Sequence, residues 1–324
     1  MYRHINVGLI GTGNHGSRYL NHIINDLSNL FSLKGVCCKT SSKGQQLAQK
    51  FSTQFFPDFS ELIAHPAIEA VISVTPPHLN KNIAKCCLAH GKKLLLEKPL
   101  STDLAEAQYI VDSFKSANLE LTIGQTLRFN PVIKTLKNEF SRIGTPYAFS
   151  ATHRLEPSTI PWLEDPAQAG AGVIFHTAVH MFDALRYITG LEVKRVHASS
   201  FKIHNANLED LFTAKIEMDN GFVGIVESSK ITPARSARYE FTGSSGQLQG
   251  DQIHGFVQFV KGMNREDIFR SEPEPAILYM LHEWFLFLSG GGNNPVSAED
   301  GLAAVKICDA CRNSSLTQQW VAIL

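Results

Sequence analysis

The first third of the chain alternates short apolar runs with segments whose apolar residues recur every three or four positions. The runs predict strands and the periodic segments predict helices. The expected strands are residues 5–10, 33–38, 70–74, 93–96 and 119–123, and the expected helices are 20–27, 45–51, 83–88 and 104–114. Ser101 or Thr102 is expected to cap the last helix. Near-continuous apolar strands joined by helices predict a doubly wound α/β fold with a parallel sheet.

After about residue 124 the pattern changes to alternation of apolar and polar positions, which predicts strands with one buried face. Residues 147–151 and 212–218 alternate in this way, and Asp219-Asn220-Gly221 is a strong hairpin turn signal. Further strand candidates are residues 222–227, 238–241, 246–249 and 256–260. We therefore expect a first domain over residues 1–124 and a second, α+β domain over residues 125–324 with a largely antiparallel open sheet.

One expected helix of the second domain, residues 174–188, carries polar residues that are unusual for a solvated face. His176, His180, Asp183 and Tyr187 lie at offsets 0, 4, 7 and 11. At about 100° per residue they share a narrow strip opposite the apolar stripe. Lys and Glu would be usual on a solvated face, so the strip indicates a site. Gly170 and Gly172, just before the helix, are expected to let a substrate or cofactor approach.

Composition and charge narrow the classes of function. The chain has 324 residues, 30 Lys+Arg and 30 Asp+Glu, and 44% of its residues are hydrophobic, which argues against disorder. A formal charge of zero argues against nucleic-acid binding by bulk phosphate neutralisation, but leaves room for one small anion. No apolar stretch reaches the ~20 residues of a membrane span, and the N-terminus has no signal-peptide pattern. We expect a cytoplasmic protein that binds neither nucleic acid nor membrane.

A glycine-rich motif, Gly11-Thr12-Gly13-Asn14-His15-Gly16, follows the first strand and opens a helix. In that context G-x-G-x-x-G is a signature of Rossmann dinucleotide binding. The first glycine permits a tight turn, the second lets the backbone approach a pyrophosphate, and the third lets helix and strand pack closely. The helix N-terminus then faces the phosphates. The motif predicts that the first domain binds a nicotinamide dinucleotide.

The end of the second strand favours NADP over NAD. An acidic residue is expected there to bind the ribose 2′-hydroxyl of NAD. The sequence instead reads Cys38-Lys39-Thr40-Ser41-Ser42-Lys43, with no Asp or Glu. An acid would repel a 2′-phosphate, whereas Lys39, Thr40 and Ser41 can bind it. We expect NADP(H) as cofactor, with NAD(H) as the alternative.

The fifth strand leads into Glu97-Lys98-Pro99, at the edge where ligands of open α/β sheets bind. A lysine at that edge is a candidate catalytic group. Pro99 has no backbone N–H to donate to the sheet and is a candidate for a cis peptide.

The ordered motifs resemble the glucose–fructose oxidoreductase / inositol dehydrogenase / MocA family, and the resemblance covers nearly the whole chain. The segments that carry it are GTGNHG at 11–16, TPPHL at 75–79, EKPLS at 97–101, GQTLRFNP at 124–131, GAGVIFH at 170–176 with His180 and Asp183, and PVSAEDG at 295–301. The resemblance implies NAD(P)-dependent hydride transfer on sugars, cyclitols or related carbonyl compounds. It also implies a C-terminal open sheet that forms a homodimer or homotetramer.

The resemblance suggests roles for individual residues. It implies cofactor contacts at the glycine motif, at Cys38, Thr75, Pro76 and Gln125, and at Glu97 and Lys98. Arg128 and Asp183 are candidate substrate ligands, and Trp162, in a Pro-rich segment, is a candidate lid or stacking surface for a sugar ring. Alternatively, Arg128 is an ordinary surface arginine and Trp162 only packs within its loop.

The family usually has Asp at the position of His176 and His at that of His180. We expect His180 to be the general base, since an ordinary histidine pKa near 6.5 suits that role. His176 would be a helper or substrate ligand, and Lys98 would stabilise the substrate oxygen.

Three interpretations of the histidine strip stay open. Besides catalysis, His at i and i+4 can bind zinc, but no Glu lies between the two histidines as in the common zinc motif, so we predict no metal. The histidines could also be satisfied interface residues of a non-catalytic NADP-binding sensor or assembly protein with the same fold. Retention of Lys98 and His180 favours the enzyme.

Overall fold

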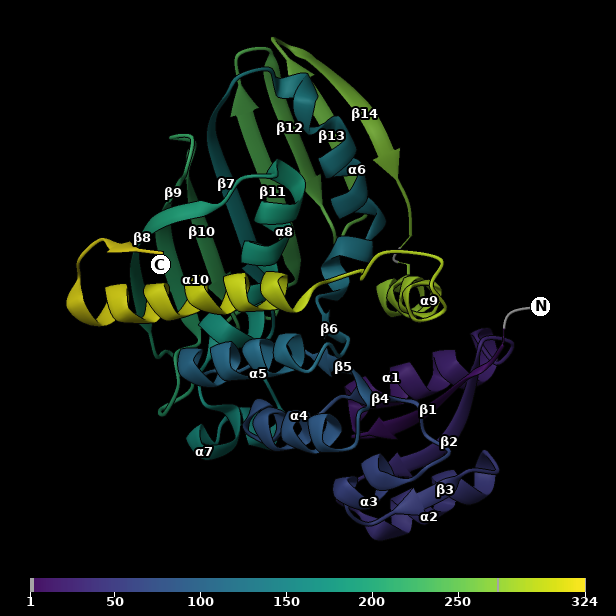
Figure 1. The fold of residues 1–324 in the computed structure, drawn as a ribbon. Coiled ribbons are helices and arrows are strands. Elements are labelled where there is room, and N and C mark those ends of the chain that lie inside the picture. The colour runs from purple at the N-terminus through teal and green to yellow at the C-terminus, as the bar shows by residue number, and fades with distance from the viewer. Residues whose placement is uncertain (1–2, 273, 324) are drawn as a thin grey trace. The chain divides into compact units, whose positions relative to one another are not determined.

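Two sheets organise the chain in the computed structural model, which describes residues 3–272 and 274–323 (Figure 1). The chain divides into one unit of Met1–Gln125 with Ile277–Leu302 and another of Thr126–Ala276 with Ala303–Leu324. The expected division after residue 124 lies beside the observed one. The segment 277–302, which we had assigned to the second domain, instead belongs to the first unit.

The first unit contains a six-stranded sheet with the order β3-β2-β1-β4-β5-β6, in which every pair is parallel. Its strands are β1 (Ile5–Ile10), β2 (Phe31–Cys37), β3 (Gln54–Phe56), β4 (Ala70–Ser73), β5 (Lys93–Glu97) and β6 (Leu121–Gly124). Its helices are α1 (Asn14–Asn21), continued by a π turn (His22–Asp26), α2 (Ser41–Lys50), α3 (Phe59–Ala64), α4 (Asn80–Ala89), α5 (Leu104–Ser116) and α9 (Ala276–Leu288). The doubly wound parallel sheet is confirmed.

Two details of the first unit differ from expectation. Neither Ser101 nor Thr102 is the cap of α5: the cap is Asp103, whose carboxylate accepts from the Glu106 N–H at 2.8 Å. Ser101 Oγ instead accepts from the Asp103 N–H at 3.1 Å. The short elements β3 and α3 had no prediction, since three strand residues are too few to show a period.

The returning segment 277–302 joins the first unit through apolar packing and one amide. Trp284 and Phe285 of α9 lie against Phe31, with ring centroids 5.9 and 5.6 Å apart respectively. The Asn294 amide accepts from Thr122 Oγ1 at 2.9 Å and donates to the Leu121 carbonyl at 2.8 Å. These contacts complete the first unit's core with residues that are distant in sequence.

The second unit contains a nine-stranded sheet with the order β14-β13-β12-β11-β7-β10-β9-β8-β15. All neighbouring pairs are antiparallel except β7 and β10, which are parallel, so the largely antiparallel sheet is confirmed. The strands are β7 (Pro146–Arg154), β8 (Val193–Phe201), β9 (Leu211–Met218), β10 (Val223–Ser229), β11 (Ser236–Gly243), β12 (Gly246–Asp251), β13 (Phe256–Lys261), β14 (Asn264–Arg270) and β15 (Val321–Ala322). The pattern of apolar and polar positions does not predict β8, β14 or β15.

Among the described residues, three helices pack on one face of this sheet and leave part of the other exposed. They are α6 (Pro131–Glu139), α8 (Val179–Thr189) and α10 (Ala298–Thr317), whereas the short α7 (Pro166–Ala169) packs on the turn Pro161–Leu163. Figure 1 shows α6 and α8 side by side over the sheet. On the opposite face of β10, Val223 and Ile225 are 46% and 56% exposed. Within residues 3–272 and 274–323, no helix combines the length and apolarity needed to cross a membrane.

Candidate active site

The glycine motif adopts the tight geometry that its spacing predicts. It lies between β1 and α1, and Gly11 has φ +88°, a conformation that side chains disfavour. A Cβ on Gly11 would collide with the Val74 carbonyl, and one on Gly16 would collide with the Gly11 carbonyl. Gly13, the residue before α1, differs: a Cβ there would meet no atom of the described residues within 4 Å. The loop backbone is therefore tightly packed at Gly11 and Gly16, and there is open space beside Gly13.

Buried polar atoms of the first unit support a fit to a dinucleotide. Thr12 Oγ1 and Gln125 Oε1 are buried and lack a hydrogen-bond partner among the described residues. Such atoms are rare in proteins, because leaving them unsatisfied costs about 1–3 kcal/mol. Gln125 follows β6 and Thr12 follows β1, so both lie at the carboxyl ends of parallel strands. Open space at Gly13 and these unsatisfied groups fit a polar cofactor at that edge.

The loop after β2 is polar, exposed and free of acidic residues. No Asp or Glu occurs between Asp26 and Asp58. Lys39, Thr40 and Ser41 are exposed, and Cys38 Sγ lies 3.4 Å from the Thr40 carbonyl. Lys43 reaches back from α2 and donates to the Thr12 carbonyl in the glycine motif. This contact links the predicted ribose-binding loop to the predicted phosphate-binding loop.

Glu97 connects the glycine motif to Lys98. His15 Nε2 and the Tyr19 hydroxyl both donate to Glu97 Oε1, at 2.8 and 2.5 Å, and the Lys98 N–H donates to Oε2 at 2.9 Å. Burial acts to raise the pKa of Glu97, but His15, the charge of Lys98 and the Tyr19 hydroxyl together lower it below its ordinary value. The Glu97 carboxylate is therefore ionised at neutral pH. Its hydrogen bonds tie α1 to the end of β5, next to Lys98.

The chain after Lys98 is fixed by a residue to which the sequence analysis assigned no chemistry. The Lys98–Pro99 peptide is cis. The buried Asn80 amide donates to the carbonyls of Pro99 and Leu100 at 3.0 and 3.2 Å. Thr75 and Pro76 lie in the loop after β4, and Thr75 Oγ1 donates to Asn80 Oδ1 at 3.4 Å. Asn80 thus ties the Thr75–Pro76 segment to the Lys98 loop.

The histidine helix of the second unit begins with a π turn, Ile174–Ala178, and continues as α8. A π turn uses i→i+5 hydrogen bonds, so the expected rotation of 100° per residue does not hold over His176. His176 is 8% exposed and His180 is half-buried. His176 Nε2 donates to the Ala169 carbonyl at 3.0 Å, and its ring meets Trp162 edge-on at 5.5 Å. His176 and Trp162, both named from sequence, are thus neighbours.

Glu209 anchors the start of this helix, and the sequence analysis had missed it. Its Oε1 accepts from the N–H groups of Gly172 and Ile174, at 2.9 and 3.4 Å, and its carbonyl accepts from Val173 at 2.8 Å. A Cβ on Gly172 would collide with the Glu209 carbonyl. Gly172 therefore permits close packing against Glu209, and its expected role in letting a ligand approach stays a prediction. Burial raises the pKa of Glu209, although its backbone hydrogen bonds act to lower it.

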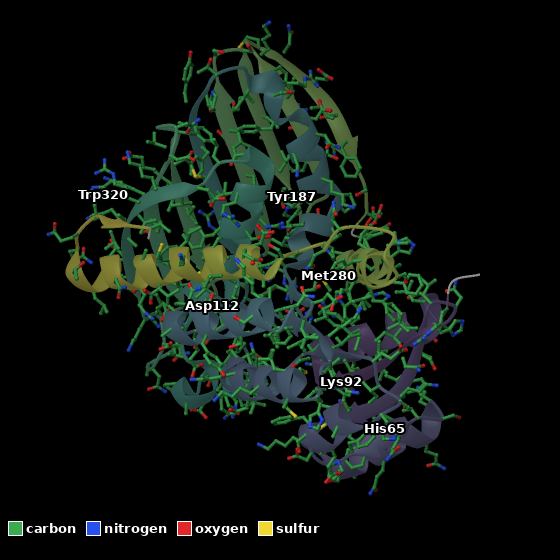
Figure 2. All side chains as sticks on the ribbon, viewed as in Figure 1. His65, Lys92, Asp112, Tyr187, Met280 and Trp320 are labelled. Atoms are coloured by element: carbon green, nitrogen blue, oxygen red, sulfur yellow. The ribbon has the colours of Figure 1, made fainter. Side chains whose placement is uncertain are left out.

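Arg128 and Asp183, both predicted substrate ligands, form a buried two-pronged ion pair. Arg128 Nε and Nη2 donate to Asp183 Oδ2 and Oδ1 at 2.9 and 2.6 Å. Asp183 is 0% exposed and Arg128 is 9% exposed. Tyr187, labelled in Figure 2, has its ring 5.3 Å from the guanidinium carbon. In this structure Asp183 has no exposed surface through which to touch a substrate, so it would act by holding Arg128.

Four buried hydroxyls of the second unit have no hydrogen-bond partner within the described part of the chain. They are Thr177 Oγ1 on the π turn, Ser228 Oγ and Ser229 Oγ on β10 and the Tyr239 hydroxyl on β11, which we call the unpaired hydroxyls. The π turn packs on β10, and Ser228 pairs with His153 across β7 and β10. Burial, followed by the charge of Asp183, raises the pKa of Tyr239. The sequence analysis had missed these residues, because Ser, Thr and Tyr are ordinary strand residues.

Among the residues that the structure describes, no group of three or more His, Cys, Asp or Glu is arranged to hold a metal ion. Lys98 belongs to the first unit, whereas His180 and the unpaired hydroxyls belong to the second.

Comparison with known proteins identifies the family. Residues 5–125 match the model described as "Oxidoreductase family, NAD-binding Rossmann fold", and residues 139–249 match "GFO/IDH/MocA C-terminal domain". The chain is 26% identical to the uncharacterized oxidoreductase YrbE of Bacillus subtilis, over 97% of this chain and 95% of that protein. It is 25% identical to myo-inositol 2-dehydrogenase of Thermotoga maritima, with 95% of both chains covered.

A solved structure has the same fold. Levoglucosan dehydrogenase in complex with NADH superposes with a TM-score of 0.90 at 22% identity, over 99% of this chain and 100% of that one. The two family models lie in order along the chain and together match most of it, consistent with both sheets. The chain is therefore a member of the GFO/IDH/MocA family of NAD(P)-dependent oxidoreductases.

Proposed function

We propose that this protein is a dehydrogenase or reductase that prefers NADP(H) and interconverts a hydroxyl and a carbonyl on a sugar, a cyclitol or a related polyol. The substrate class rests on relatives whose names state action on inositols, myo-inositol 2-dehydrogenase of Thermotoga maritima and scyllo-inositol 2-dehydrogenase of Bacillus subtilis. Within this chain, Lys98 and His180 are both partly exposed and offer polar groups to a hydroxyl of such a substrate.

The cofactor preference rests on the loop after β2. Cys38, Lys39, Thr40 and Ser41 would surround the adenosine ribose, and the lysine would balance the charge of a 2′-phosphate. The pyrophosphate would lie on the backbone of residues 11–16, with Thr75, Pro76, Glu97 and Gln125 as further contacts. A bound nicotinamide supplies hydride acceptance or donation.

The chain's own residues would handle the proton and the charge on oxygen. In oxidation, His180 takes the proton of the substrate hydroxyl as general base. Lys98 donates a hydrogen bond to the same oxygen and stabilises the negative charge that develops on it. Arg128 would hold a second substrate oxygen with Asp183 behind it, and Trp162 would stack on the ring. His176 would assist as a substrate ligand.

An absorbance screen at the NADPH band tests the proposal, with NADP and NADPH offered against sugars, inositols, sugar acids and nucleotide sugars. We expect turnover of at least one neutral polyol or its ketone, and faster turnover with NADP(H). Lys98→Met should lower kcat by about 10²–10³-fold while the Kd of NADP is unchanged. Wild-type rates in that variant would refute the role of Lys98. Tight NADP binding without turnover of any compound would instead indicate a non-catalytic sensor.

The proposal includes assembly and location. The exposed face of β10, with Val223 and Ile225, would form the contact of a homodimer or homotetramer in the cytoplasm. On either side, the register places Ala148 and Ser150 of β7 and Glu217 and Lys215 of β9 beside these residues. The small and apolar residues of β7 and β10, bordered by these two charged residues, suit a flat contact between copies.

A further inference from the structure

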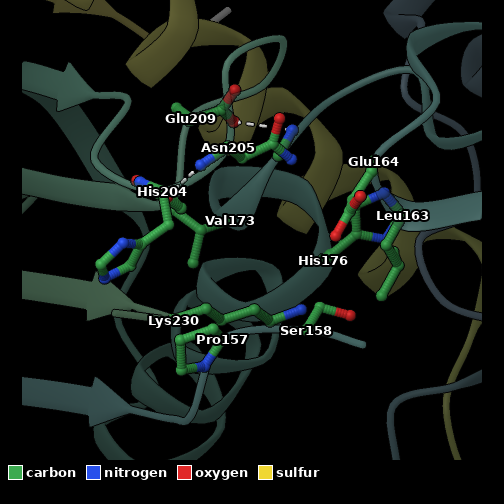
Figure 3. A pocket seen from close by; sticks show the side chains of 12 residues that line it. Pro157, Ser158, Leu163, Glu164, Val173, His176, His204, Asn205, Glu209 and Lys230 are labelled. Atoms are coloured by element: carbon green, nitrogen blue, oxygen red, sulfur yellow. Dashed lines mark hydrogen bonds between the residues drawn. The ribbon is translucent and has the colours of Figure 1, made fainter. Parts of the chain in front are cut away.

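The second unit contains a pocket of about 100 Å³ beside the start of the histidine helix (Figure 3). Gly172, Val173 and His176 form one wall, and loops that follow β7 and β8 form the others together with Lys230. This volume accommodates several water molecules or one polar substituent, but no protein segment. Because His176 lines it, one turn from His180, the pocket is placed to take part of a small molecule.

The pocket wall carries three carboxylates. Glu209 accepts from the backbone at the helix start, and Asp210 accepts from the N–H groups of Ile203, His204 and Asn205 at 2.7–2.8 Å. Backbone N–H groups hold both side chains in place. Glu164 contributes an exposed third carboxylate, which Figure 3 shows on the side opposite His204.

The two histidines of the wall, His176 and His204, each direct one ring nitrogen at a backbone carbonyl. Nε2 of His176 and of His204 lies 3.0 and 3.2 Å from the carbonyls of Ala169 and Ile231. A carbonyl only accepts, so Nε2 carries the proton in each ring. In the neutral ring Nδ1 is then an acceptor.

Lys230 is the one Lys or Arg among the described residues that line the pocket. Its ammonium extends toward Ser158 (Figure 3). The carboxylates of Glu164 and Asp210 outnumber this ammonium and give the pocket a negative field, which repels anions and attracts groups that donate hydrogen bonds.

We propose that this pocket is a specificity subsite for an uncharged, hydroxyl-bearing substituent of the substrate, and that it discriminates against a carboxylate or phosphate at that position. The inference rests on the function proposed above. A hydroxyl can donate to Glu164 and accept from Lys230, whereas a carboxylate or phosphate only accepts and adds negative charge. The subsite would thus select neutral sugars or cyclitols over sugar acids and sugar phosphates.

Calorimetric binding to the NADPH-loaded protein, which cannot oxidise an alcohol, tests the subsite. The probes are glucose, glucuronate and glucose 6-phosphate, which share a ring and differ at one exocyclic carbon. Glucose should bind about tenfold or more tightly than either anion. Glu164→Gln removes one exposed charge, so it should reduce the ratio of the affinity for glucose to the affinity for either anion severalfold. Glu240→Gln, which removes an exposed carboxylate on β11 that does not line the pocket, should leave the ratio unchanged.

Three outcomes would overturn the subsite: an anion that binds as tightly as glucose, a ratio that Glu164→Gln does not change, or no binding of glucose. The proposed function fails separately, by the absence of hydride transfer in the screen. If the protein discriminates among the probes but turns over no compound, the subsite is supported and the proposed enzymatic function is refuted. If it turns over a phosphorylated sugar preferentially, the enzymatic function is supported and the subsite is refuted.

Discussion

Lys39 is the residue on which the choice of cofactor most directly depends. It is exposed in an acid-free loop, so its side chain can reach a phosphate without breaking a contact inside the unit. Lys39→Asp should weaken NADP binding by at least about tenfold through lost attraction and new repulsion. NAD binding should be unchanged or tighter. Fluorescence titration with NADPH and NADH measures both constants.

Lys50→Asp is the matched control, because Lys50 is an exposed lysine at the far end of α2. This variant should not change the ratio of the dissociation constants of NADPH and NADH. Equal effects of the two variants would mean that general charge, rather than the loop, sets the preference.

Asp183 provides a second test at this scale, on stability. Its ion pair with Arg128 is buried, and removing one partner of a buried pair costs about 3–5 kcal/mol. Asp183→Asn should therefore lower the urea unfolding free energy by that order. The Arg186–Glu192 pair has a similar two-pronged geometry, but Glu192 is 61% exposed, so Glu192→Gln should cost about 1 kcal/mol or less. Equal losses in the two variants would contradict the structural role of Asp183.

At the scale of elements, the π turn and its anchor Glu209 determine how the histidine helix begins. Because burial raises the pKa of Glu209, its protonated form is favoured in the folded state. The stability it contributes is full below its ordinary pKa of 4.5 and is lost as pH rises through the raised value. Glu209→Gln keeps an acceptor oxygen without ionising. Its melting temperature should therefore equal that of the wild type at acidic pH and exceed it increasingly toward neutral pH.

Differential scanning calorimetry across that pH range measures the effect, and Glu209→Ala distinguishes the charge from the hydrogen bonds. The alanine variant loses the bonds to Gly172 and Ile174, so it should be less stable than the glutamine variant at every pH. A pH-independent difference between wild type and Glu209→Gln would disprove the raised pKa.

The elements also show what sequence patterns can and cannot predict. The glycine motif, the parallel strands and the Asp219–Gly221 turn were predictable because local spacing encodes them. The π turn was not, since its sequence fits an ordinary helix, and the rotation assumed for His176 failed there. Glu209 acts through contacts with residues 172–174, which are distant from it in sequence, and no local period records them. Arg128 and Asp183 were each predicted as substrate ligands, but their ion pair was not predicted, because 55 positions separate them.

For the whole molecule, the exposed middle of the second sheet is the feature that bears on assembly. Ile225→Glu places a charge in the centre of the face that we propose joins copies of the chain. Burying an unpaired charge in a contact is unfavourable, so the variant should shift the protein toward the monomer. Size-exclusion chromatography with light scattering measures the change in mass. Met263→Glu, at a fully exposed hairpin tip, should leave the mass unaltered; an unaltered mass for Ile225→Glu would place the contact elsewhere.

The return of residues 277–302 to the first unit has a consequence for how the protein is made. During translation, the cofactor-binding unit must wait for its last segment until residue 302 has been synthesised. At about 5–20 residues per second, that delay after residue 125 is roughly ten to thirty seconds. Throughout this interval Phe31 lacks Trp284 and Phe285, and the nascent sheet exposes an apolar surface to chaperones. A fragment that ends at residue 125 would keep that surface uncovered permanently.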